Sequence, residues 1–178
     1  MEVRPATAAD AAAIAGIYNA EVTSSTVTFD LVPRSIDEQV AWIEQRSGGH
    51  AALVVTDGDD LVGFGALSPY RERPAYTTSV EDSVYVHRDH RGRGVGRLVL
   101  AGLIDTARNH GFHTVFARVV GGHEASIQLH QQAGFTVIGT EREVGRKFSR
   151  WLDVVVMQLL LDGGGEGTPP GRPPVLES

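Results

Sequence analysis

Cysteine is absent from the 178 residues of the chain. Disulfide bonds, thiolate metal sites and a cysteine nucleophile are therefore excluded, and no metal site is expected. No apolar run is long enough to cross a membrane, and the N-terminal residues MEVRPATAAD lack the apolar segment of a secretory signal. We therefore expect a cytoplasmic protein without a membrane partner.

An excess of positive charge is also missing. The chain has 16 lysine and arginine residues against 22 aspartate and glutamate residues, which gives a formal net charge of -6. This balance disfavours nucleic acid as a partner, because non-specific binding to phosphates needs a basic surface. A local cluster of arginines in such a protein points instead to a small anionic ligand.

Helices alternate with strands over residues 1–161. Capping-box spacings at Thr7/Asp10 and Ser35/Glu38 predict two helix starts. Helical apolar spacing predicts a helix from residue 95 that is capped near Gly111, and a shorter helix ends at Gly134. Strands are predicted at 51–55, 61–67, 79–86, 112–120, 135–144 and 151–161. This order predicts one mixed α/β (α+β) domain with helices on both faces of a sheet.

The segment 162–178, DGGGEGTPPGRPPVLES, has a different composition. It holds five glycines and four prolines, so it cannot build a packed core. We expect a disordered tail there, which places the domain at 1–161.

The most informative stretch is HRDHRGRGVGRLVL, residues 87–100, where glycines separate a strand from a helix. Unpaired N–H groups and the helix dipole favour an anion at a helix N-terminus, and glycine permits a close approach. We therefore expect the 91–96 loop to hold a phosphate or pyrophosphate, with Arg91, Arg93 and Arg97 as counter-charges. A bare strand-to-helix turn is the alternative explanation of the glycines alone.

Two common phosphate motifs do not fit this loop. A Walker loop ends in Gly-Lys-Ser/Thr, which is missing here. In the dinucleotide fingerprint the third glycine would fall at Arg97 or Val99, so both registers fail.

The spacing Arg91, Gly94 and Gly96 resembles the acetyl-CoA pyrophosphate loop of the GNAT family of N-acetyltransferases. SVYV before the loop is similar to the family's splayed strand, and ASIQLHQQAGF, residues 125–135, resembles its second CoA-binding segment. STVTF, YRERPAY, VEDSVYVHRDHRGRGVG and VGRKFSRWLDVVVMQLLL resemble the phosphinothricin and methionine sulfone/sulfoximine acetyltransferase group. The likeness extends to Leu161.

The resemblance implies a GNAT fold and direct transfer of acetyl from acetyl-CoA to a primary amine. Glu81 matches the family's acidic residue and would accept the amine proton; without the resemblance it would be read as an exposed strand residue. The strand is expected to splay at Val84–Val86, where the N–H of Val86 would stabilise the oxyanion. The cofactor residues implied in this way are Val84, Tyr85, Val86, Arg91, Gly92, Arg93, Gly94, Val95, Gly96, Arg97, His123 and Ser126.

Two histidines depart from the commonest pattern of the family. His130 stands where many members have a tyrosine, and it could act as general acid, as a second base or in packing. His123 stands where many relatives carry an asparagine that contacts the pantetheine, so this contact and a plain helix-start role are both open.

The resemblance also implies a substrate site for an amino acid that carries a carboxylate and a phosphinate or sulfone oxygen. Arginine suits such oxyanions because its planar fork donates two hydrogen bonds. The implied residues are Thr28, Phe29, Arg71, Arg73, Tyr76 and Lys147, although a solvated charged loop would explain residues 71–73 equally well. Phe148 and Trp151 fall in a region that approaches the active site and the dimer partner in this group.

The sequence therefore predicts an acetyl-CoA-dependent N-acetyltransferase for a small amino-acid analogue such as phosphinothricin or methionine sulfone/sulfoximine, acting as a homodimer. An enzyme that acetylates another small amine or a protein N-terminus is the nearest alternative. A non-catalytic acetyl-CoA sensor is a third, and the presence of Glu81 argues against it.

Overall fold

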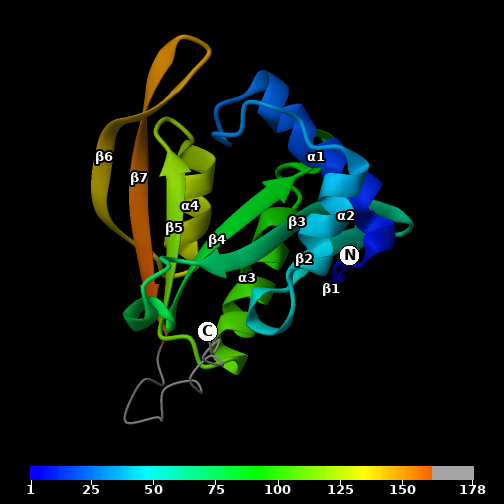
Figure 1. Cartoon of the computed structure of the whole chain (residues 1–178), viewed down its shortest axis with the longest axis horizontal. Helices are drawn as coiled ribbons and strands as arrows, with labels where there is room; N and C mark the ends of the chain where they lie inside the picture. Colours follow the sequence, from blue (N-terminus) through cyan, green and yellow to red (C-terminus); the bar gives the residue numbers. More distant parts are fainter. Residues whose placement is uncertain (162–178) are drawn as a thin grey trace, which may run out of the picture.

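The computed structural model describes residues 1–161, which form one mixed seven-stranded sheet with helices on both faces (Figure 1). This confirms the predicted fold class. The strand order is β1-β2-β3-β4-β5-β7-β6. The strands are β1 (Glu2–Pro5), β2 (Ala52–Asp57), β3 (Asp60–Pro69), β4 (Ser79–Val86), β5 (Thr114–Val120), β6 (Thr136–Lys147) and β7 (Arg150–Leu160). The helices are α1 (Ala11–Ser24), α2 (Ile36–Glu44), α3 (Val95–Asn109) and α4 (Glu124–Gln132). The segment predicted as a tail, 162–178, lies outside the described residues.

The helix starts follow the predicted caps. Ser35 accepts a hydrogen bond from the backbone N–H of Glu38, and the Glu38 carboxylate accepts one from the N–H of Ser35, which begins α2. Asp10 accepts a hydrogen bond from the N–H of Thr7 at 2.8 Å, but this contact closes a short 3-10 turn before α1. Strand β1 was not predicted, because four residues at the sheet edge carry too little alternation to be recognised.

The two faces of the sheet have separate apolar clusters. Helix α3 packs on one face through Val95, Val99 and Leu103, and α4 lies on the same side. Helices α1 and α2 cover the other face, where Ile14 and Tyr18 pack against Phe64. Because strand side chains alternate, successive residues of a central strand reach opposite faces.

Strands β6 and β7 form a long hairpin, and the prediction from sequence placed its turn too early in the chain. Strand β6 continues to Lys147, three residues beyond the predicted end, and β7 begins at Arg150. The turn residues Phe148 and Ser149 adopt the left-handed region with φ of 50° and 60°. Neither is a glycine or asparagine, so the usual signal for such a turn was missing.

Strands β4 and β5 separate along their length, as Figure 1 shows where β4 leans away from β5. They pair in parallel only at Ser79–Thr114, Val80–Val115 and Glu81–Phe116. From Asp82 onward the β5 side of β4 is unpaired, so the splay implied for Val84–Val86 is present and begins two residues earlier. Within residues 1–161, no helix is both long and apolar enough to cross a membrane.

Candidate active site

A cavity of about 670 Å³ occupies the splay between β4 and β5. Its walls come from both faces of the sheet. Asp82, His130 and Gly96 belong to the side of α3 and α4, whereas Glu81, Thr28 and Arg118 belong to the side of α1. The cavity therefore joins the two faces through the sheet, and two molecules could meet in it from opposite sides.

The glycine loop forms one end of this cavity. Gly92 and Gly94 have φ of 74° and 85°, a conformation that other residues rarely adopt, and Gly94 caps the N-terminus of α3. A Cβ on Gly96 would lie 3.2 Å from Cδ2 of Leu129, so glycine also allows α3 to approach α4. The first N–H groups of α3 lack intrahelical partners and lie at the wall of the cavity, and the anion expected there stays a prediction.

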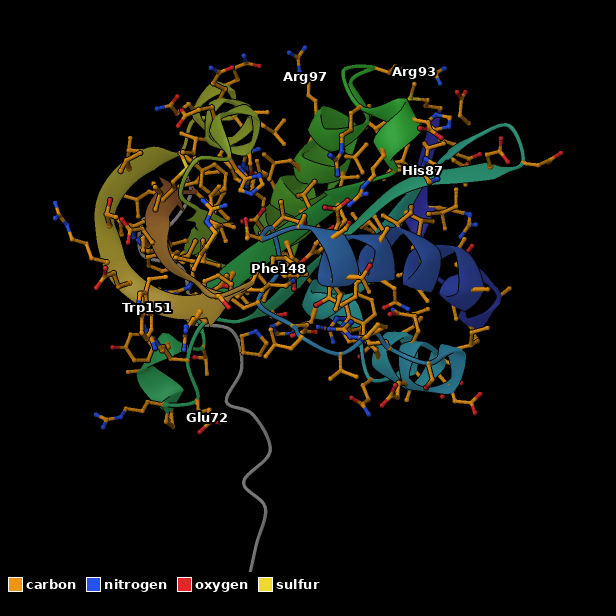
Figure 2. All side chains as sticks on the ribbon, turned by 90° about the horizontal axis from the view of Figure 1, so that it is seen from above. Glu72, His87, Arg93, Arg97, Phe148 and Trp151 are labelled. Atoms are coloured by element: carbon orange, nitrogen blue, oxygen red, sulfur yellow. The ribbon has the colours of Figure 1, made fainter. Side chains whose placement is uncertain are left out.

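The arginines of this loop differ in their surroundings. Arg91 lines the cavity and donates to Glu21 Oε1 at 2.8 Å, and Arg88 donates to the same oxygen at 2.8 Å. Arg97 lines the cavity and bonds Gln132, whereas Arg93 lies outside it and pairs with Asp57 at 3.0 Å. Figure 2 shows Arg93 and Arg97 reaching outward at this end of the molecule.

Glu21, which was not predicted as a site residue, lies buried on α1 beneath these arginines. Burial opposes ionisation of its carboxyl, but the hydrogen bonds from Arg88 and Ser25 and the charge of Arg91 outweigh it and lower the pKa of Glu21. The ionised carboxylate of Glu21 thus forms ion pairs with Arg88 and Arg91 beside the cavity.

The open edge of β4 presents backbone groups to the cavity. The N–H of His87 donates to Val62 O on β3 at 2.9 Å. Because successive N–H groups of a strand point to opposite sides, those of Val84 and Val86 point toward the splay. These are the groups from which an oxyanion contact was predicted.

Glu81 is half-buried on the face of α1, and with Phe116 it forms the last residue pair of the parallel ladder. Burial raises the pKa of its carboxyl; the positive charge of Arg118 opposes that rise, and the negative charge of Asp82 adds to it. A carboxyl with a raised pKa in a cavity has the property expected of a general base.

His130 is buried on α4 and uses both ring nitrogens. Nδ1 lies 2.7 Å from Ser126 O, and Nε2 lies 3.0 Å from Asp82 Oδ2. A carbonyl only accepts, so Nδ1 carries a hydrogen. Burial opposes the charged ring, but the bond to Asp82, the charge of Asp82 and the Ser126 carbonyl together raise the pKa of His130. The direction of this shift favours the protonated ring, and the roles predicted for His130 stay predictions.

His123 and Ser126 line the cavity at the start of α4. Nε2 of His123 lies 3.2 Å from Thr26 Oγ1, which links α4 to the segment after α1. Val84, Tyr85, Val86, Gly92, Gly94 and Val95 also line the cavity, so Arg93 alone of the predicted cofactor residues does not.

The segment after α1 supplies the wall near Glu81. Thr28 and Phe29 line the cavity, as predicted. Lys147 does not: it is buried, and its Nζ donates to Thr28 O at 2.9 Å. Burial lowers the pKa of its ammonium group. The ring of Phe29 rests on β6, where a Cβ on Gly145 would lie 2.4 Å from the ring.

Arg71, Arg73 and Tyr76 lie on the loop between β3 and β4, and none of them lines the cavity. Figure 2 places Glu72 of this loop far from Arg93 and Arg97. Tyr76 contacts Tyr70 with ring centroids 5.6 Å apart, and Tyr70 stacks on Phe116 at 4.0 Å. The loop thus lies against the Glu81 side of the sheet without entering the cavity.

Among the cavity residues that were not predicted from the sequence, three are charged: Glu21, Asp82 and Arg118. Arg118 is held by Glu141, which accepts from both of its Nη atoms. Each is a charged residue within a segment that was predicted as a helix or a strand, which was the signal available in the sequence. Within residues 1–161, no group of three or more histidine or acidic side chains is placed to bind a metal ion.

Comparison with known proteins agrees with this geometry. A family model described as an acetyltransferase (GNAT) domain matches residues 3–156. The chain belongs to the GNAT acetyltransferase family. Its enzyme class is that of the N-acyltransferases, and its similarity to the phosphinothricin and methionine sulfoximine/sulfone acetyltransferase group confirms the resemblance found in the sequence.

Three relatives illustrate this similarity. The chain is 40% identical to the L-amino acid N-acyltransferase MnaT of Escherichia coli K12, over 91% of this chain and 95% of the relative. It is 40% identical, with the same coverage, to an L-methionine sulfoximine/L-methionine sulfone acetyltransferase of Salmonella typhimurium. It is 39% identical to a phosphinothricin N-acetyltransferase of Streptomyces coelicolor, over 86% and 92%.

Two solved structures show the fold with its cofactor. An acetyltransferase from Salmonella typhimurium, described with acetyl-CoA, superposes with a TM-score of 0.90 at 38% identity and covers 94% of this chain and 98% of that one. A phosphinothricin acetyltransferase from Sinorhizobium meliloti in complex with acetyl-CoA gives a TM-score of 0.88 at 33% identity, over 96% and 93%.

Proposed function

We propose that the protein transfers acetyl from acetyl-CoA to the α-amine of a small amino-acid analogue such as phosphinothricin or methionine sulfone/sulfoximine. The observation that carries this proposal is the cavity through the sheet, with the glycine loop at one end and Glu81 on the opposite face. The names of the relatives support the substrate class.

The residues present fit acetyl-CoA. The free N–H groups of α3 behind Gly92 and Gly94 suit its pyrophosphate, and Arg91 and Arg97 supply positive charge there. The unpaired edge at Val84–Val86 suits the amide groups of its pantetheine arm, which would extend the sheet. Arg93 would add only long-range charge.

Acetyl-CoA supplies an activated acetyl group as a thioester. Glu81 accepts a proton from the substrate ammonium, directly or through water, so that the neutral amine attacks the thioester carbonyl carbon. The N–H of Val86 donates to the carbonyl oxygen as negative charge develops on it. The attacking nitrogen now carries a positive charge and loses its second proton to water. The carbon–sulfur bond then breaks, and its electron pair stays on sulfur.

His130 donates the proton that this sulfur needs. The hydrogen bonds to Asp82 and Ser126 raise the pKa of His130 above its ordinary value and so favour the protonated ring that this step requires. A thiol has a pKa of about 8.5, so its protonation needs only a weak acid. Exchange with solvent returns a proton to His130 and removes one from Glu81.

Thr28 and Phe29 form the wall for the substrate side chain. Lys147 stabilises this wall by donating a hydrogen bond to the Thr28 carbonyl. For Arg71, Arg73 and Tyr76, a substrate contact requires the loop between β3 and β4 to approach the cavity when the amino acid binds.

We also infer a cytoplasmic homodimer. Val144, Phe148 and Trp151 are 48%, 52% and 61% exposed on the β6–β7 hairpin, where Figure 2 shows Phe148 and Trp151. Clustered exposed apolar side chains favour a protein interface. Sedimentation of the wild type and of Trp151→Ser tests this inference, since the dimer should weaken in the variant.

A thiol-release assay tests the proposed function. The protein has no cysteine, so a thiol-reactive dye reads only free CoA. Phosphinothricin, methionine sulfone and methionine sulfoximine are compared with ordinary amino acids, a polyamine and an N-terminal peptide. Release with one of the first three supports the proposal. Release with the polyamine or the peptide alone contradicts it in favour of another amine, and binding of acetyl-CoA without any release favours a sensor.

A further inference from the structure

Arg118 is a cation on the same face of the sheet as Glu81. Glu81 is paired with Phe116 across the parallel ladder, and paired residues share a face. Arg118 follows two residues later on β5 and therefore extends to that face, where it lines the cavity together with Glu81. The charge of Arg118 opposes the rise in the pKa of Glu81, as expected of a neighbour.

The guanidinium of Arg118 is fixed in place but only partly used. Nη1 donates to Glu141 Oε1 at 2.8 Å, and Nη2 donates to Oε2 of the same carboxylate. Glu141 lies on β6 opposite Val154 of β7, so its carboxylate reaches the fork from the second strand beyond β5. A guanidinium has five N–H donors, and these two bonds leave three for another acceptor. The side chain keeps 26% exposure, so it is accessible from the cavity.

Other cations are less well placed for a ligand near Glu81. Of the three arginines that line the cavity in residues 1–161, Arg91 and Arg97 belong to the glycine loop. Lys147 is buried against the Thr28 carbonyl, and Arg71 and Arg73 lie outside the cavity. Arg118 is therefore the cation that an anion beside Glu81 would meet first.

An α-amino acid carries its carboxylate on the carbon that bears the amine. A fixed donor fork beside the base would therefore hold both groups in one orientation, with the amine at Glu81. We propose that Arg118 binds the α-carboxylate of the substrate and so selects free amino acids over amines that lack this group. The inference rests on the proposed function, because it assumes that an amine is acetylated at Glu81.

The experiment compares methionine sulfone with its carboxamide, which keeps the amine and the side chain but loses the carboxylate charge. In the wild type, kcat/KM should favour the acid by about tenfold or more, since a charge-assisted hydrogen bond contributes about 1.5–3 kcal/mol. Arg118→Met should abolish this preference by raising KM for the acid much more than KM for the carboxamide. The two amines differ in basicity, but this difference cancels when the acid-to-amide ratio is compared between variants.

Arg108→Met is the matched control, because Arg108 is an exposed arginine of α3 that pairs only with Asp105. It should keep the wild-type preference. Arg118→Lys keeps the charge without the fork and should show an intermediate preference, which also serves if the methionine variant fails to fold. A preference that survives in Arg118→Met, or a wild type that acetylates both compounds equally, overturns the inference while leaving acetyl transfer intact.

If the wild type acetylates none of methionine sulfone, methionine sulfoximine and phosphinothricin, the proposed function fails. Binding of methionine sulfone and its carboxamide then decides the inference separately. Calorimetry of the two compounds with the protein in the presence of CoA should show tighter binding of the acid, and this difference should vanish in Arg118→Met. Equal binding of acid and carboxamide to the wild type overturns the role of Arg118.

Discussion

Asp82 Oδ2 lies 3.0 Å from His130 Nε2, and both side chains are almost fully buried. The pair connects β4 to α4 across the splay that forms the cavity. It joins residues 48 positions apart in the chain, so it depends on the fold and not on any local motif.

Asp82→Asn should lower the pKa of His130, because the carboxylate charge that stabilises the imidazolium is removed. In the wild type the pKa of His130 lies above its ordinary value of 6.5. The stability from the pair should therefore be fully present below pH 6.5 and be lost as the pH rises through the folded-state pKa. Ring NMR titration gives the pKa, and denaturant unfolding at several pH values gives the stability. An unchanged His130 titration in the variant would rule out this account of the pair.

Glu81→Gln should lower kcat by about 10²–10⁴-fold, the usual contribution of a general base. The affinity for acetyl-CoA, measured by calorimetry, should stay the same. The base works only when ionised, so wild-type activity should rise with pH through a pKa above the ordinary 4.5 of Glu81, and the variant should lack this limb. Glu81→Asp is the control that keeps the charge. Equal losses in turnover and acetyl-CoA affinity would contradict a role as base.

Lys147→Met should act mainly on stability. The variant removes the donor for the buried Thr28 carbonyl, and an unsatisfied buried acceptor is destabilising by about 1–3 kcal/mol. Denaturant unfolding should show this loss, while KM should change by the same factor for methionine sulfone and its carboxamide. Unchanged stability with a rise in KM for the acid alone would show that Lys147 contacts the substrate directly.

Gly145→Ala should raise KM for the amino acid several-fold without changing acetyl-CoA affinity. The added methyl group would lie 2.4 Å from the ring of Phe29, so the ring must move and the cavity wall with it. Gly139→Ala on the same strand is the control, since its Cβ would meet nothing within 4 Å. If both variants behave alike in steady-state kinetics, Phe29 does not shape the substrate site.

Sequence patterns that span a few residues predicted the features that depend on near neighbours in the chain. The reciprocal cap at Ser35 and Glu38 placed the start of α2, and the glycines before Val95 placed the start of α3. These features depend on neighbours within a few residues. The end of β6 was misplaced because Phe148 and Ser149 give no glycine signal for their left-handed turn.

The residues that complete the site could not be predicted in this way. Glu21 meets Arg91 across 70 positions of sequence, and Arg118 meets Glu141 across 23. Such partners are set by how α1 lies under the glycine loop and by the order of β5, β7 and β6. Lys147 was expected at the substrate because the resemblance implies that its region approaches the active site, whereas the packing of β6 against Thr28 directs its side chain into the protein.

Product analysis after mixing the protein with acetyl-CoA and methionine sulfone tests the central claim most directly. NMR and mass spectrometry identify the amino-acid product, and the dye measures free thiol in the same sample. The account predicts N-acetyl methionine sulfone in an amount equal to the thiol released, with both nearly lost in Glu81→Gln. Thiol release without an acetylated amino acid, or equal product from the wild type and Glu81→Gln, would contradict it.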